Sequence, residues 1–102
     1  MSMLHIVNKS ALDRNSLETC VNHTVKGATI LMIEDGVYSA MKNTASSGMV
    51  EGAMKDVSVA VLGPDLKARG ISEEKLIDGV TVVDYAGFVE LTTKNDSVQS
   101  WL

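Results

Sequence analysis

The only thiol in this chain of 102 residues belongs to Cys20. As a thiolate it can attack a sulfur atom or bind a metal ion, and His5 and His23 are the other soft ligands in the sequence. A zinc site needs four protein ligands, or three and a water, so these scattered residues predict no metal site. Cys20 also fits the apolar stripe of a helix with Leu17 and Val21, where a free cysteine is often a small buried residue. Cys20 is therefore the candidate catalytic residue, and core packing is the alternative.

Carboxylates form a second candidate site. Four acidic residues follow apolar runs that should be strands: Glu34, Asp35, Asp65 and Asp84. The carboxyl ends of parallel strands share one edge of a sheet, and carboxylate oxygens gathered there would suit Mg²⁺. We favour the alternative that Asp35 and Asp84 are helix N-caps, because each stands where a helix should begin and can accept a bond from an amide of its first turn.

The composition argues against several classes of protein. The chain has 13 acidic and 9 basic residues, a net charge of −4, and its lysines and arginines are scattered, so we expect no direct binding to nucleic acid or to a membrane. No glycine-rich loop has the spacing that wraps phosphate, and no cofactor is expected. One cysteine cannot form an internal disulfide, and neither a secretory signal nor an apolar run of membrane-spanning length is present. These features predict a cytoplasmic protein.

Four short apolar runs should position these side chains. They are continuous rather than alternating, as in strands that are covered on both faces, and lie at residues 3–7, 28–33, 57–62 and 80–83. The segments between them are long enough for helices, which predicts parallel strands with right-handed crossovers. We expect an α/β fold: an open, mostly parallel sheet of four to five strands with helices on both faces. The length suits one domain over residues 1–102, and the tail at 97–102 is a candidate edge strand.

The first helix decides the surroundings of Cys20. It should end at Lys26 and Gly27, a basic last turn followed by a glycine, and its start is near Ser10 or at Asn15 or Ser16. A start at Ser10 puts Cys20 about 13 Å from the positive end of the helix, away from the dipole that lowers the pKa of a thiol. A start at Asn15 halves that distance. The spacing alone does not choose between them.

The remaining segments divide at glycine, proline and serine. A second helix should open at Asp35 and run to about Asn43, and the small polar stretch at 44–52 is expected to be a flexible loop. The turn at 63–65 should lead into a short helix that ends at Gly70, with another helical turn at 72–75 and a last helix at 85–93.

Two further features concern packing. Four methionines gather in the middle of the chain, where they either form a partner surface or fill gaps in the core: Met32, Met41, Met49 and Met54. The single tryptophan, Trp101, should anchor the C-terminal tail on its own chain or on a neighbour.

Five sequence blocks together resemble the DsrH/TusB family of sulfur-relay proteins. They are Leu-His-Ile-Val-Asn-Lys-Ser at 4–10, Ile-Glu-Asp-Gly-Val-Tyr at 33–38, Asp-Leu-Lys-Ala-Arg-Gly at 65–70, Asp-Tyr-Ala-Gly-Phe-Val at 84–89 and the closing Ser-Trp at 100–101. They occur in order over nearly the whole chain, and the second and fourth blocks are specific in combination.

The resemblance implies a small α/β subunit that assembles with DsrE-like and DsrF-like sister chains into a cytoplasmic heterohexamer with two copies of each. Such a complex passes sulfane sulfur as cysteine persulfide, so the chain would be a sulfur carrier or sulfurtransferase subunit rather than a stand-alone enzyme. In one branch the sulfur serves sulfur oxidation, with a DsrC-like acceptor. In the other, the TusB type, it goes to 2-thiouridine in transfer RNA.

Within this resemblance, Cys20 matches a first-helix cysteine of the sulfur-oxidising branch that the TusB type lacks, which favours the DsrH type and makes Cys20 a candidate persulfide carrier. The principal cysteine of the family lies on the DsrE-like sister chain. Persulfide transfer needs an accessible thiolate and neither nucleotide nor metal. The alternative is a non-catalytic structural subunit of the same kind of complex.

Overall fold

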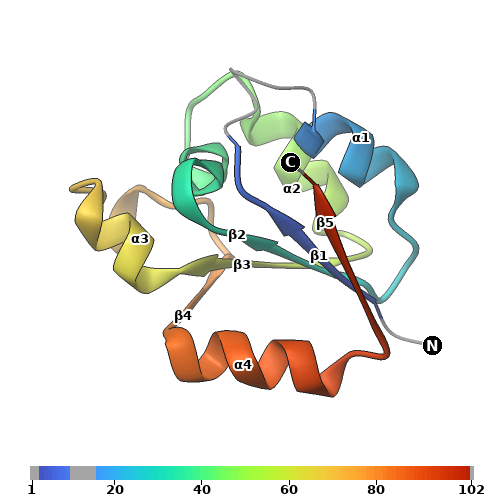
Figure 1. The fold of residues 1–102 in the computed structure, drawn as a ribbon. Helices are drawn as coiled ribbons and strands as arrows, with labels where there is room; N and C mark the ends of the chain where they lie inside the picture. The colour runs from blue at the N-terminus through green and yellow to red at the C-terminus, as the bar shows by residue number, and fades with distance from the viewer. Residues whose placement is uncertain (1–2, 10–15, 102) are drawn as a thin grey trace.

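A five-stranded parallel sheet forms the centre of the described chain, which comprises residues 3–9 and 16–101 of a computed structural model (Figure 1). Its order is β4-β3-β2-β1-β5. The strands are β1 (Met3–Val7), β2 (Thr29–Met32), β3 (Ser58–Leu62), β4 (Thr81–Val83) and β5 (Ser97–Trp101). The four predicted strands are confirmed, with ends that move by at most one residue, and the tail is the edge strand beside β1. The predicted fold class is confirmed.

Helices connect the strands. They are α1 (Ser16–His23), the 3-10 helix η1 (Glu34–Ala40), α2 (Ser47–Ala53), α3 (Gly63–Ala68), the short 3-10 helix η2 (Glu73–Lys75) and α4 (Tyr85–Lys94). In Figure 1, α4 runs below the sheet, while α1 and α2 lie on the opposite side. Within the described residues no helix is both long and apolar enough to cross a bilayer.

The two faces of the sheet carry cores of very different size. On the larger face, α1, η1, α2 and α3 all contribute buried apolar residues to one cluster with the strands. On the smaller face, the buried cluster consists of Leu4, Leu31 and Ala60, covered by half-buried residues of α4 such as Phe88 and Leu91. Side chains alternate between the faces along a strand, and α4 itself has no buried residue.

The segment predicted as a flexible loop is ordered. Residues 44–52 contain most of α2, and Ser46 and Ser47 are buried. Ser47 Oγ donates to the Met41 carbonyl at 2.8 Å and accepts from the Thr44 amide at 2.9 Å, so its hydroxyl satisfies the backbone of the turn. The prediction of a loop at 44–52 was therefore wrong, because residues 47–52 belong to α2.

The second and first helices are shorter than predicted. The helix expected at 35–43 is a 3-10 helix that ends at Ala40. The first helix ends at His23 rather than at Lys26, and Gly27 adopts a left-handed φ of 91° while its amide donates to the Asp56 carbonyl. The alternative starts at Ser10 and Asn15 lie outside the described residues.

Candidate functional site

Cys20 lies in α1 with its side chain inside the larger core, where none of it is exposed. Burial raises the pKa of its thiol to about 12, because the apolar surroundings disfavour the charged thiolate. In this conformation the thiol stays protonated at neutral pH, and it has neither the access nor the charge that sulfur exchange requires.

His5 lies in β1 and is 2% exposed. Its Nδ1 accepts a hydrogen bond from Trp101 Nε1 at 3.0 Å, so the neutral ring carries its proton on Nε2. Among the described residues Nε2 has no hydrogen-bond partner. Burial lowers the pKa of His5, because it disfavours the imidazolium.

Trp101 joins the C-terminal strand to two other elements. Its ring centroid is 6.1 Å from that of His5 in β1 and 5.9 Å from that of His23 in α1. The prediction that Trp101 anchors the tail is confirmed, and the anchor is on the same chain. Both histidine rings therefore lie beside the indole of Trp101. Cys20 is one helical turn before His23 in α1, but its side chain lies inside the core.

The acidic residues at the carboxyl ends of the strands have structural partners. Asp84 caps α4 and accepts from the Gly87 amide at 2.8 Å, as predicted. Asp35 caps nothing, which corrects its prediction: its Oδ1 accepts from Arg69 Nε at 3.0 Å. Asp65 Oδ2 accepts from the Glu34 amide at 2.7 Å.

These contacts explain the geometry of the acidic edge. Glu34, whose backbone amide donates a hydrogen bond to Asp65, has a left-handed φ of 50°, which a non-glycine residue seldom adopts. Within residues 3–9 and 16–101, no three His, Cys, Asp or Glu side chains gather so that they could hold a metal ion.

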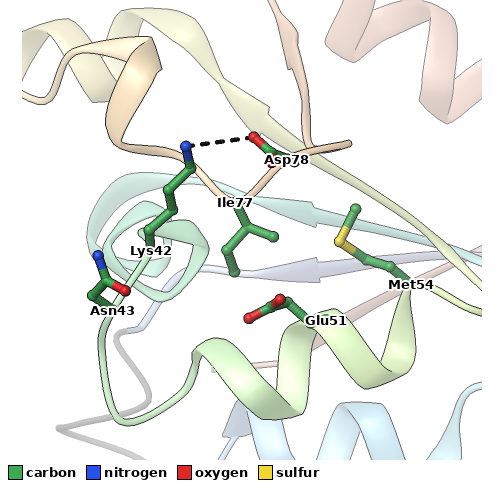
Figure 2. Close-up of a pocket in the computed structure, with 6 residues that line it drawn as sticks. All are labelled: Lys42, Asn43, Glu51, Met54, Ile77 and Asp78. Carbon is green, nitrogen blue, oxygen red and sulfur yellow. Dashed lines mark ion pairs between the residues drawn. The ribbon is translucent and has the colours of Figure 1, made fainter.

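A pocket of about 380 Å³ opens beside residues of the larger core, and Cys20 is not part of its lining. It is lined by Lys42, Asn43, Glu51, Met54, Ile77 and Asp78 (Figure 2). Lys42 Nζ and Asp78 Oδ1 lie 3.4 Å apart across it, and the Asp78 side chain is almost fully exposed. Its lining contains no thiol, hydroxyl or imidazole.

No motif or spacing predicted this pocket, because its walls come together through tertiary pairing. An isolated antiparallel bridge between Met41 and Leu76 brings the chain after η1 beside the chain before β4. Of the four methionines noted in the sequence, Met32 is buried, and Met41, Met49 and Met54 pack half-buried against the larger core.

Comparisons with known proteins agree over nearly the whole chain. The family model DsrH, described as DsrH like protein, matches residues 9–98. The Protein TusB of Pectobacterium parmentieri is 29% identical over 100 residues, covering 97% of this chain and 100% of that protein. The Protein TusB of Buchnera aphidicola subsp. Baizongia pistaciae (strain Bp) is 33% identical over 99 residues, with the same coverage.

Solved structures share the fold. The ychN protein from E. coli matches with a TM-score of 0.81 at 20% identity, covering 99% of both chains. The protein of unknown function MTH1491 from Methanobacterium thermoautotrophicum matches with a TM-score of 0.76 at 17% identity, covering 97% of both chains. At such identities these likenesses speak to the fold alone.

Proposed function

This chain belongs to the DsrH/TusB family, and on that premise we propose that it serves a sulfur relay as an assembly subunit rather than through its own thiol. The observation that carries the proposal is the burial of Cys20, whose thiol has no exposed surface and a pKa raised to about 12. A sulfur carrier must present a thiolate to both a donor and an acceptor. A sealed, protonated thiol does neither.

The proposed partners are DsrE-like and DsrF-like sister chains, two copies of each chain forming a cytoplasmic heterohexamer. The smaller face of the sheet supports an assembly role. Its outer helix α4 exposes Tyr85 by 63% and Val89 by 60%, one turn apart on one side of the helix. Exposed apolar side chains of this size over a thin core suit contact with a sister chain.

Reconstituted sulfur transfer tests the assembly role. The three chains would be combined with this chain either native or as Cys20→Ala, and sulfur delivered to the acceptor would be measured over time. The proposal predicts transfer at an unchanged rate, because the thiol serves only packing. A loss of ten-fold or more in a complex of normal size would contradict it. Cys20→Ser is the matched control, because it keeps the shape of the side chain.

Sulfur carriage by Cys20 is the second candidate, and it rests on the match of Cys20 to a first-helix cysteine of the sulfur-oxidising branch. It requires that α1 move so that the thiol reaches solvent. In the reconstituted relay this candidate predicts that Cys20→Ala and Cys20→Ser fail equally, since neither can hold a persulfide.

For the branch, we propose delivery of sulfur to 2-thiouridine in transfer RNA, with sulfur oxidation through a DsrC-like acceptor as the alternative that Cys20 predicts. The support is that the curated relatives described above carry the name TusB at 29–33% identity. Deletion of the gene should deplete 2-thiouridine, measured by mass spectrometry of digested transfer RNA. Undiminished 2-thiouridine together with impaired sulfur oxidation would favour the alternative.

A further inference from the structure

The C-terminal strand is tied to the first strand by a side-chain hydrogen bond between residues 96 positions apart. Trp101 Nε1 donates to His5 Nδ1 at 3.0 Å. Most of β5 is otherwise exposed: Ser97 to Ser100 lie at the surface, and Val98 is 47% exposed. As an edge strand, β5 pairs with β1 alone. Apart from the indole of Trp101 and its hydrogen bond, little buried surface therefore keeps β5 in place.

The bond exists in only one protonation state of His5. The indole nitrogen can only donate, so Nδ1 must offer its lone pair. A proton from solvent that binds Nδ1 uses that lone pair and sets two N–H groups against each other. Protonation would also place a positive charge on a side chain that is 98% buried and that has no hydrogen bond to a described carboxylate.

The elements around His5 offer little to stabilise a positive charge. Neither β2 nor β5 contains a charged residue. The described part of α1 contributes Glu18 and His23, both exposed, and the His23 ring centroid is 5.9 Å from that of the indole. On its own element, the charged group next to the strand end is Lys9, which is exposed and of the same sign as imidazolium.

We propose that the Trp101–His5 hydrogen bond is a proton-sensitive latch, which holds β5 in the sheet while His5 is neutral and releases the strand when a proton occupies Nδ1. This inference rests on the geometry of the strand and stands or falls independently of the proposed function. Released, β5 would leave β1 as the open edge of the sheet, ready to pair with another strand. Burial lowers the pKa of His5 in the closed strand, so His5 takes up a proton more readily once the strand has opened, and a falling pH therefore favours release.

Trp101 is the only tryptophan in the chain, so its fluorescence reports on the latch directly. Emission would be recorded between pH 8 and pH 4.5 for the native chain, His5→Gln and His23→Gln. Gln accepts from an indole N–H through its amide oxygen but takes up no proton. We expect emission to shift to the red as pH falls in the native chain and in His23→Gln, and to stay constant in His5→Gln. A constant His23→Gln with a responsive His5→Gln would overturn the latch.

Hydrogen exchange of the native chain keeps the test decisive if His5→Gln does not fold. The amides of β5 that donate to β1 would be followed by NMR, and their exchange rates would be corrected for the intrinsic pH dependence of exchange. Below about pH 6.5, each unit of pH should raise the open fraction of β5 about ten-fold until the closed strand itself is protonated. Amides of β2, such as that of Leu31, should stay far better protected than those of β5 at each pH, because they exchange only when the central sheet unfolds. A protection of β5 that is independent of pH down to pH 4.5 would refute the proposal.

Discussion

The two faces of the sheet differ in how completely this chain covers them. Four helical segments seal the larger face, where residues such as Leu17, Cys20 and Met32 have almost no exposed surface. One helix covers the smaller face, and three buried residues form its core. A parallel sheet is normally covered on both faces, and the thinly covered smaller face is the one on which we propose that a sister chain binds. The Cys20 thiol belongs to the buried core of the larger face.

Matched leucine truncations test this contrast with the largest expected effect. Leu17→Ala, on the larger face, should lower the free energy of unfolding by about 2–5 kcal/mol, because it leaves a cavity in a sealed core. Leu91→Ala, in the half-buried cover of the smaller face, should cost about 1 kcal/mol. Chemical denaturation of both variants gives the comparison. Equal losses would mean that the two faces contribute alike to stability.

A close approach between η1 and β1 provides the next test of the larger face. A Cβ on Gly36 would collide with the backbone carbonyl of Val7, so Gly36→Ala should destabilise the chain by about 1–3 kcal/mol. Gly52→Ala in α2 is the control, since nothing lies within 4 Å of its added Cβ and alanine favours a helix. The control should unfold at the same or a higher denaturant concentration. If Gly36→Ala behaved like the control, the packing of η1 on β1 would be wrong.

The pH dependence of unfolding tests the buried histidine. Because the pKa of His5 is lowered in the folded chain, the unfolded chain binds more protons below its ordinary pKa of 6.5. The contribution of neutral His5 is therefore complete above about pH 6.5 and is lost as pH falls towards the lowered value. Denaturation at several pH values should show this loss in the native chain and a smaller one in His5→Gln. A native chain whose stability rises on acidification through this window would contradict the burial of a neutral ring.

The smallest expected change in stability belongs to the outer side of α4. Val89→Lys should leave the free energy of unfolding within about 0.5 kcal/mol, because the side chain is 60% exposed, and should weaken assembly with the sister chains. Val25→Lys, at a 64% exposed position after α1, is the matched control and should assemble normally. Size-exclusion chromatography of the mixed chains distinguishes them. Assembly that survives Val89→Lys and fails with Val25→Lys would move the contact away from α4.

Local chemistry made much of this fold predictable. Continuous apolar runs marked the strands, and Asp84 could be placed as an N-cap because its partner, the Gly87 amide, is three residues away. Asp35 could not, because the side chain that engages it belongs to Arg69, 34 positions along the chain. The loop predicted at 44–52 failed for a similar reason, since Ser47 reaches back to the Met41 carbonyl to order the turn.

The candidate site was predictable in its residues but not in its state. Helical spacing left Cys20 open to either reactivity or packing, and only the three-dimensional core determines how much of it is exposed. The contact of Trp101 with His5 spans 96 positions, so the sequence could indicate that the tail docks but not on which side chain. Nothing in the spacing indicated the pocket between α2 and Asp78.

Intact-protein mass spectrometry of the assembled complex after exposure to a sulfane-sulfur donor tests the central claim most directly. We predict that this chain gains no sulfur, because its Cys20 thiol is buried and protonated, and that a sister chain carries the load. A gain of whole sulfur atoms on this chain that disappears in Cys20→Ser would contradict that claim and make Cys20 a carrier.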